Sequence, residues 1–113
     1  MNPQYLGEFE EIVLIAILRL RDNAYGVTIR SLIEEETKRT TSIGAVYTTL
    51  ERLETKGYIS SKQGEATPER GGRAKRYFKI EGAGVRVLNE TTEMRSRLRR
   101  GLGPEWTPVG GLA

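Results

Sequence analysis

Cysteine and histidine are both absent from the 113-residue chain. Their absence excludes disulfides, thiolate nucleophiles, imidazole acid–base catalysis and zinc sites of the usual ligand types. It also excludes a thiol redox switch and argues against a switch at mid pH. Because the sequence shows no metal-ligating cluster or phosphate-cradling loop either, we expect no enzymatic activity, no metal site and no cofactor.

Long hydrophobic runs are also lacking. The longest, residues 12–18, has seven apolar residues and follows Glu8, Glu10 and Glu11. It is too short to span a membrane, and its acidic approach differs from the basic start of a signal peptide. We therefore expect a cytoplasmic protein that does not associate with membranes.

What remains is an ordinary globular composition with a mild excess of positive charge. Hydrophobic residues make up 37% of the chain and charged residues 29%, which is typical of a folded, water-soluble domain. A length of 113 residues allows one domain with one small core. The net charge of +3 makes acidic partners such as nucleic acids admissible without requiring them.

A short, one-sided helix is predicted within residues 41–59. Apolar side chains recur there at spacings of three, four and three, which places them on one buried stripe: Ile43, Val46, Leu50 and Leu53. Thr41 or Ser42 supplies the N-cap, and Gly57 suits a left-handed C-terminal stop. With about 100° of rotation per residue, Thr48 points almost directly away from the stripe.

The outward face of this helix is small and rich in hydroxyl groups. Around Thr48 it carries Gly44, Ala45, Glu51, Arg52 and Thr55, with Tyr47 on the flank. Small residues let a helix approach another surface closely, and hydroxyls can donate to phosphates or contact base edges. Serine and threonine also gather at helix starts as caps, so this stretch alone leaves DNA contact and capping equally open.

A helix over residues 8–21 is apolar around most of its circumference. Its apolar positions are Phe9, Ile12, Val13, Ile15, Ala16, Ile17, Leu18 and Leu20. Such a helix needs burial on more than one side, and in so small a chain we expect one side to contact a second subunit through Phe9, Val13 and Ile17. The alternative is that it is the central helix of a monomeric core.

Beyond the helix at 41–59 the pattern changes to alternation. Residues 58–63 and 74–80 are predicted to form a two-stranded ribbon with Phe78 and Ile80 on the core. Residues 64–72, rich in glycine, form the tip, and four cations lie at or near it: Arg70, Arg73, Lys75 and Arg76. A charge cluster is usually a hydrated loop, but a basic finger next to a helix-turn-helix also suits the phosphate backbone of DNA.

The last predicted helix covers residues 81–100. It carries a near-heptad seam that suits another helix, and we assign this seam to dimerisation: Val87, Leu88, Thr91, Met94 and Leu98. Beyond it, residues 101–113 contain four glycines and two prolines. This end should be an irregular, flexible tail.

The order of these elements predicts the fold class. A helix at 27–37, whose acidic residues 34–36 are most simply a solvated face, leads by a brief connection into the helix at 41–59. With the hairpin that follows, this is a winged helix-turn-helix in a mainly α chain with a small β-hairpin (α+β). We divide the chain into a DNA-binding domain (1–80), a dimerisation helix (81–100) and the tail (101–113).

Three segments resemble the PadR family of bacterial transcriptional regulators, particularly its short members. They are "YGVTIRSLIEEE" at 25–36, "SIGAVYTTLERLETKGYI" at 42–59 and "GGRAKRYFKIEGAG" at 71–84, and the likeness covers about residues 6–100. It implies a homodimer that binds operator DNA and usually represses. Because some short relatives bind flat aromatic compounds between subunits near a tryptophan of the last helix, it also raises a small aromatic effector, although Trp106 lies beyond the predicted helix end.

The resemblance assigns roles residue by residue. Ser42, Gly44 and Tyr47 match the recognition-helix motif, and the wing motif matches Gly71, Gly72, Arg73, Lys75, Arg76 and Tyr77. Packing is at least an equal alternative to DNA contact for Tyr47 and Tyr77.

We therefore expect a homodimeric repressor whose two recognition helices enter successive major grooves of a pseudo-palindromic operator, about 34 Å apart. The predicted DNA-binding residues are Thr41, Ser42, Gly44, Ala45, Tyr47, Thr48, Thr49, Arg52, Arg70, Arg73, Lys75 and Arg76. The alternative is a dimeric protein-interaction module that uses the same fold without binding DNA.

Overall fold

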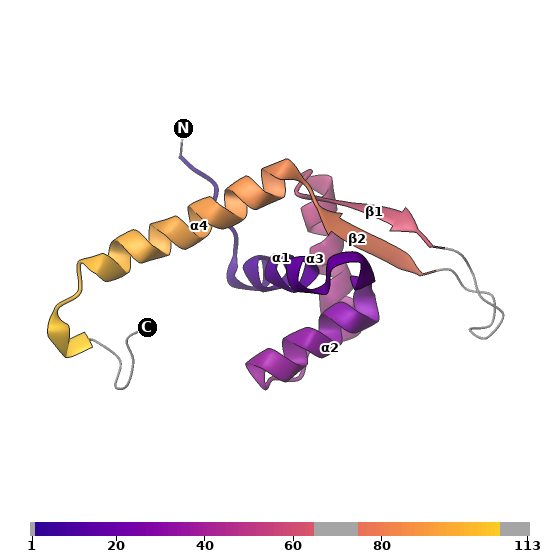
Figure 1. The fold of residues 1–113 in the computed structure, drawn as a ribbon, viewed down its shortest axis with the longest axis horizontal. Coiled ribbons are helices and arrows are strands. Elements are labelled where there is room, and N and C mark those ends of the chain that lie inside the picture. The colour runs from indigo at the N-terminus through magenta and orange to yellow at the C-terminus, as the bar shows by residue number, and fades with distance from the viewer. Residues whose placement is uncertain (1, 65–74, 107–113) are drawn as a thin grey trace.

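The computed structural model describes residues 2–64 and 75–106. In chain order its elements are α1 (Glu8–Leu20), η1 (Arg21–Asn23), α2 (Gly26–Thr37), α3 (Ile43–Thr55), β1 (Ile59–Gln63), β2 (Arg76–Ile80), α4 (Gly82–Arg100) and η3 (Pro104–Trp106), as Figure 1 shows. α2 and α3 form the helix-turn-helix, and β1 and β2 form the hairpin beside it. The predicted α+β class with a winged helix-turn-helix is confirmed.

Local signals fix both ends of α3. The Oγ of Ser42 accepts a hydrogen bond from the backbone N–H of Ala45 at 3.0 Å, so Ser42, rather than Thr41, is the N-cap. Gly57 lies just beyond the C-cap with a φ of 80°, a left-handed conformation that glycine adopts without steric cost. The helix therefore forms where the sequence predicts it.

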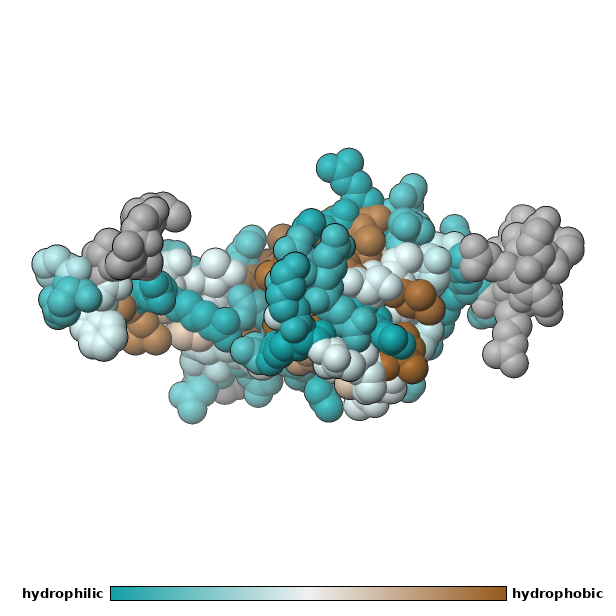
Figure 2. Space-filling model, turned by 90° about the horizontal axis from the view of Figure 1, so that it is seen from below, coloured by the Kyte–Doolittle hydropathy of each residue, from teal (hydrophilic) through white to brown (hydrophobic). Residues whose placement is uncertain are grey.

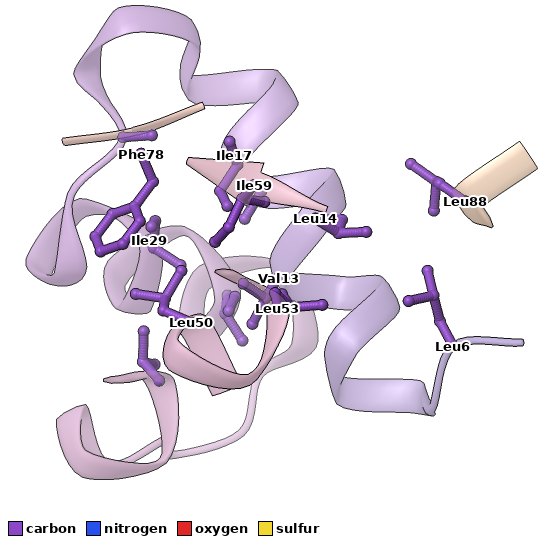
Figure 3. Close-up of a cluster of buried hydrophobic side chains, with 14 of the residues drawn as sticks. Leu6, Val13, Leu14, Ile17, Ile29, Leu50, Leu53, Ile59, Phe78 and Leu88 are labelled. Atoms are coloured by element: carbon purple, nitrogen blue, oxygen red, sulfur yellow. The ribbon is translucent and has the colours of Figure 1, made fainter. Parts of the chain in front are cut away.

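α1 is the central helix of the core. Figure 3 shows Val13 and Ile17 among side chains from the other elements, and both are almost completely buried. Burying one such side chain stabilises the fold by about 1.5–3 kcal/mol. The prediction that Val13 and Ile17 contact a second subunit is wrong, because the chain's own core already covers them. Phe9 is half-buried and stays a prediction, while Ile15 and Leu18 are the large apolar residues that α1 exposes.

The first half of α4 packs on the body, and its second half extends away from it (Figure 1). Leu88 meets Leu6 at one end of the core (Figure 3). Beside them, the hydroxyl of Thr91 accepts a hydrogen bond from the N–H of Leu6 at 3.0 Å and donates to the carbonyl of Val87 at 2.8 Å. These contacts join the segment before α1 to α4.

This packing changes the interpretation of the seam on α4. Val87, Leu88 and Thr91 are buried within the chain, so their predicted role in dimerisation is wrong. Met94 is half-buried and Leu98 is 71% exposed. Only this outer part of the seam stays a predicted dimer contact.

The start of α4 lies close to the hairpin because residue 84 is glycine. A Cβ on Gly84 would overlap the carbonyl oxygen of Tyr58 and would lie 2.7 Å from Cγ1 of Ile80. The same carbonyl of Tyr58 accepts a hydrogen bond from the N–H of Glu81 at 2.9 Å. This close approach sets the direction in which α4 leaves the hairpin.

β1 and β2 pair antiparallel, from Ile59 opposite Ile80 to Gln63 opposite Arg76. Phe78 is buried and Ile80 is half-buried, which confirms the predicted alternation. The side chains of Arg76, Phe78 and Ile80 therefore share the face toward the body, and their neighbours in β2 point to the other face.

Some predictions concern residues outside the described ranges. These are the cations Arg70 and Arg73, the glycines Gly71 and Gly72, and residues 107–113 of the tail. In the described part of the tail, which we predicted to be irregular, Pro104–Trp106 forms a short 3-10 turn.

The face on the side of α2 is mainly hydrophilic (Figure 2). Seen from the side of α2, apolar side chains gather in a few small groups, one of them at the end of α4 (Figure 2). Over residues 2–64 and 75–106, no helix is both long enough and apolar enough to cross a membrane.

Candidate nucleic-acid interface

The outward face of α3 is exposed as its periodicity predicts. Thr48 faces solvent, and so do its neighbours Ser42, Gly44, Ala45 and Arg52. A Cβ on Gly44 would meet no described atom within 4 Å. Glycine in a helix costs about 0.5–1 kcal/mol relative to alanine, and packing within the described chain gives no reason for that cost. Close approach of another molecular surface to the helix would explain the glycine.

Thr49 does not belong to this face. It is only 5% exposed and lies on the buried side of α3 with Val46, Leu50 and Leu53. The buried side is broader than the four-residue stripe that the sequence suggested, because α3 contacts α1 and α2 together. The prediction that Thr49 contacts DNA is therefore wrong. Thr41 is half-buried at the edge of the face and stays a prediction.

Tyr47 combines the two roles that the sequence left open. A Cβ on Gly26, the first residue of α2, would lie 2.5 Å from Cζ of Tyr47, so the end of the tyrosine ring packs against the start of α2. The rest of the ring is open to solvent, since Tyr47 is 41% exposed, and can contact another molecule. Packing and surface exposure thus coexist at this residue.

The turn before α3 is held by Glu34, a member of the acidic run that the sequence predicts to be a solvated face. Oε2 of Glu34 accepts a hydrogen bond from the backbone N–H of Thr41 at 2.7 Å. Nε of Arg30 lies 3.7 Å from the same oxygen. Lys38, between the two helices, adopts a left-handed φ of 59°. Glu34 thereby fixes the approach of the chain to α3, and its place in an acidic run gave no signal of this contact.

The far end of α3 is tied to α1 by a partly buried ion pair between Lys56 and Glu10. Glu10 is 8% exposed and accepts a hydrogen bond from Lys56 Nζ at 3.0 Å and another from the N–H of Gly7 at 2.9 Å. Burial raises the pKa of the Glu10 carboxyl, but the hydrogen bonds from Gly7 and Lys56 and the positive charges of Lys56 and Arg52 outweigh it and hold the pKa below the ordinary value of 4.5. Both ends of α3 are thus fixed to the core.

On the hairpin, Lys75 and Tyr77 form a cluster with Tyr25. The Nζ of Lys75 donates to the hydroxyl of Tyr25 at 3.1 Å and lies 4.3 Å from the centre of its ring. The rings of Tyr25 and Tyr77 meet edge to face, 5.3 Å between centres. Tyr77 therefore packs, as its alternative interpretation proposed. Lys62, exposed on β1 opposite Tyr77, adds a cation that the sequence prediction omitted.

Arg76 points to the opposite face and reaches α3. Its guanidinium forms an ion pair with Glu54 and donates from Nε to the hydroxyl of Ser61 at 2.9 Å. The structure thus brings the hairpin and α3 together at Glu54, a residue that no sequence motif singled out. The two predicted wing cations that are described, Lys75 and Arg76, lie on different faces of the hairpin.

The chain is similar to a known protein family in sequence and to solved structures in fold. The model of the transcriptional regulator PadR-like family matches residues 14–90. A transcriptional regulator from Clostridium thermocellum is 25% identical, over 80% of this chain and 82% of that chain, with a TM-score of 0.67. No curated protein matches the chain.

Two further solved structures share the fold at lower identity. A PadR-like regulator from Bacillus cereus is 18% identical over 81% of this chain and 84% of its own, with a TM-score of 0.66. A PadR family regulator from Clostridium difficile is 22% identical over 81% and 92%, with a TM-score of 0.62. Since the family match covers more than half of the 113 residues, the chain belongs to the transcriptional regulator PadR-like family.

Proposed function

We propose that this regulator binds an operator as a homodimer and represses transcription from it. The observation that carries the proposal is the outward face of α3, where Gly44 and Thr48 are exposed on a helix fixed at both ends. A rigid helix with a small, hydroxyl-bearing face can lie close to base edges in a major groove. Arg52, exposed on the same helix, suits a guanine edge or a phosphate.

The hairpin supplies charge for the phosphate backbone. Lys62 and Lys75 lie on one face of it, and Arg70 and Arg73 belong to the same wing in the sequence. Such contacts position a protein on DNA and raise its affinity without selecting sequence. We therefore assign base selection to α3 and affinity to the wing.

Exposed apolar side chains support a second subunit. Ile15 and Leu18 on α1 and Leu98 on the free half of α4 are large, apolar and open to solvent. A two-fold dimer formed through such surfaces would present two α3 helices to successive major grooves, about 34 Å apart. Effector binding is not part of the proposal, because Trp106 lies in η3, after α4 has ended.

The test is a substitution that blocks close approach without disturbing the fold. Gly44→Gln adds a side chain where no described atom lies within 4 Å. It should leave the thermal midpoint unchanged or higher, because glutamine favours helix over glycine. Affinity for a duplex from the chain's own promoter, measured by fluorescence anisotropy, should fall at least about tenfold, the value of one lost base contact.

Thr55→Gln is the matched control, since Thr55 is exposed on the same helix but at its C-terminal end. It should bind the promoter duplex like the wild type. If Gly44→Gln also binds normally, α3 does not enter the groove. If neither the wild type nor any variant binds the promoter duplex more tightly than a random duplex, the proposed operator function is contradicted. The alternative, a protein-interaction module, is then supported.

A further inference from the structure

Three polar side chains from three elements meet where the hairpin touches α3. Oε2 of Glu54 accepts a hydrogen bond from the Ser61 hydroxyl at 2.8 Å, and Oε1 pairs with the Arg76 guanidinium. The hydroxyl of Ser61 in turn accepts from Nε of Arg76 at 2.9 Å. Glu54, Ser61 and Arg76 therefore form a closed ring, which we call the Glu54 ring.

The ring engages Arg76, one of the wing cations that we expect to contact DNA. The Arg76 side chain is 42% exposed and that of Glu54 is 31% exposed, so a phosphate can reach the guanidinium from solvent. Carboxylate and phosphate both bind guanidinium through the same forked donors. A phosphate that approaches Arg76 must therefore either displace Glu54 or bind a guanidinium whose charge Glu54 partly neutralises.

We propose that Glu54 competes with DNA phosphate for Arg76 and so lowers the affinity of the regulator without contacting DNA. This inference rests on the proposed DNA-binding function. Because the pair is partly exposed, its strength is small, and its removal should change affinity by about two- to fivefold. The residue thereby tunes how tightly the regulator binds all sequences, rather than which sequence it prefers.

The experiment measures binding to a random duplex over a series of salt concentrations. Glu54→Gln keeps the shape of the side chain and an acceptor for Ser61 but removes the charge. Its affinity at low salt should exceed that of the wild type about two- to fivefold, and the slope of log affinity against log salt should steepen by about 0.9, one additional phosphate contact. Thermal melting verifies that the variant is folded.

Two variants show whether the gain belongs to the pair. Glu35→Gln removes an exposed carboxylate on α2 and changes the net charge by the same amount. It should give a smaller gain than Glu54→Gln and no change of slope. Arg76→Ala should cancel the gain when combined with Glu54→Gln, and should cost less in the wild-type background than in the Glu54→Gln background.

Each outcome decides between the two proposals. Equal gains from Glu54→Gln and Glu35→Gln, or weaker binding by Glu54→Gln, would overturn the competition while leaving DNA binding intact. If neither the wild type nor any variant binds any duplex at low salt, the proposed DNA-binding function is contradicted, and the competition with it. Should Glu54→Gln not fold, Glu54→Asp shortens the side chain with its charge kept, and an unchanged affinity and slope would then count against the competition.

Discussion

The hydroxyl end of Tyr47 on α3 occupies the space that a Cβ at position 26 on α2 would need. The two helices of the helix-turn-helix therefore pack against each other where the Tyr47 ring contacts Gly26. A tyrosine–glycine pair begins α2 in the sequence, but only the fold shows that Gly26 serves a tyrosine 21 positions further on.

Gly26→Ala should displace the Tyr47 ring at little cost, because the atoms in the way are the far end of a movable side chain. We expect a loss of stability below about 1 kcal/mol and weaker binding of the promoter duplex. In a Tyr47→Ala background the same change should be neutral or stabilising, since alanine favours helix. Urea unfolding of the wild type, the two single variants and the double variant measures these free energies. Equal effects of Gly26→Ala in both backgrounds would contradict the contact between Gly26 and Tyr47.

Gly84→Ala should be far more damaging. The added Cβ meets the backbone carbonyl of Tyr58, which cannot move without disturbing the hairpin. We expect a loss of about 1–3 kcal/mol in the free energy of unfolding, typical of overpacking. Gly82→Ala is the control, because the nearest atom to its Cβ is a guanidinium nitrogen of Arg86 at 3.7 Å. Equal unfolding midpoints for the two variants would refute the close approach.

The Glu10–Lys56 pair predicts a dependence of stability on pH. The folded chain lowers the pKa of Glu10, so the unfolded chain holds the proton more tightly, and ionised Glu10 stabilises the fold above its ordinary pKa of 4.5. That contribution is lost as the pH falls through the lower folded-state value. Glu10→Gln should be less stable by about 1 kcal/mol at pH 7, and the difference should shrink below pH 4.5. Urea midpoints over a descending pH series measure it, with Glu35→Gln as control; a constant difference would exclude the linkage.

Leu98 and Leu88 separate dimerisation from folding. Leu98 is 71% exposed, so Leu98→Glu should leave the fold intact and shift the proposed dimer toward monomer in analytical ultracentrifugation. Leu88 is buried against Leu6, and Leu88→Ala should instead lower stability by about 2–5 kcal/mol. An unchanged sedimentation coefficient for a folded Leu98→Glu variant would remove the end of α4 from the interface.

Local patterns predicted the elements of this fold well. Ser42 and Gly57 mark the ends of α3 by their own chemistry, and the alternation around Phe78 marks β2. Periodicity also showed that Thr48 faces outward, because the direction of a side chain on a short helix depends only on its position.

The residues wrongly assigned to dimerisation share a different cause. An apolar pattern shows that a side chain is buried but not what covers it. It therefore predicts a partner contact for Val13, Ile17 and Thr91, although the chain itself buries them. The ion pairs that fix the candidate interface join residues far apart in the sequence. Glu10 and Lys56 are 46 positions apart, and Glu54 and Arg76 are 22 apart. No local spacing encodes such pairs.

The hydrogen bond from Leu6 to Thr91 joins residues 85 positions apart. A nascent chain cannot make it until α4 has emerged from the ribosome, and until then this end of the core lacks its cover. Completion of this end of the core must therefore wait until residue 91 has been synthesised and has emerged. A ribosome that stalls before residue 91 would hold a polypeptide with its helix-turn-helix translated and its hydrophobic interior still open on one side.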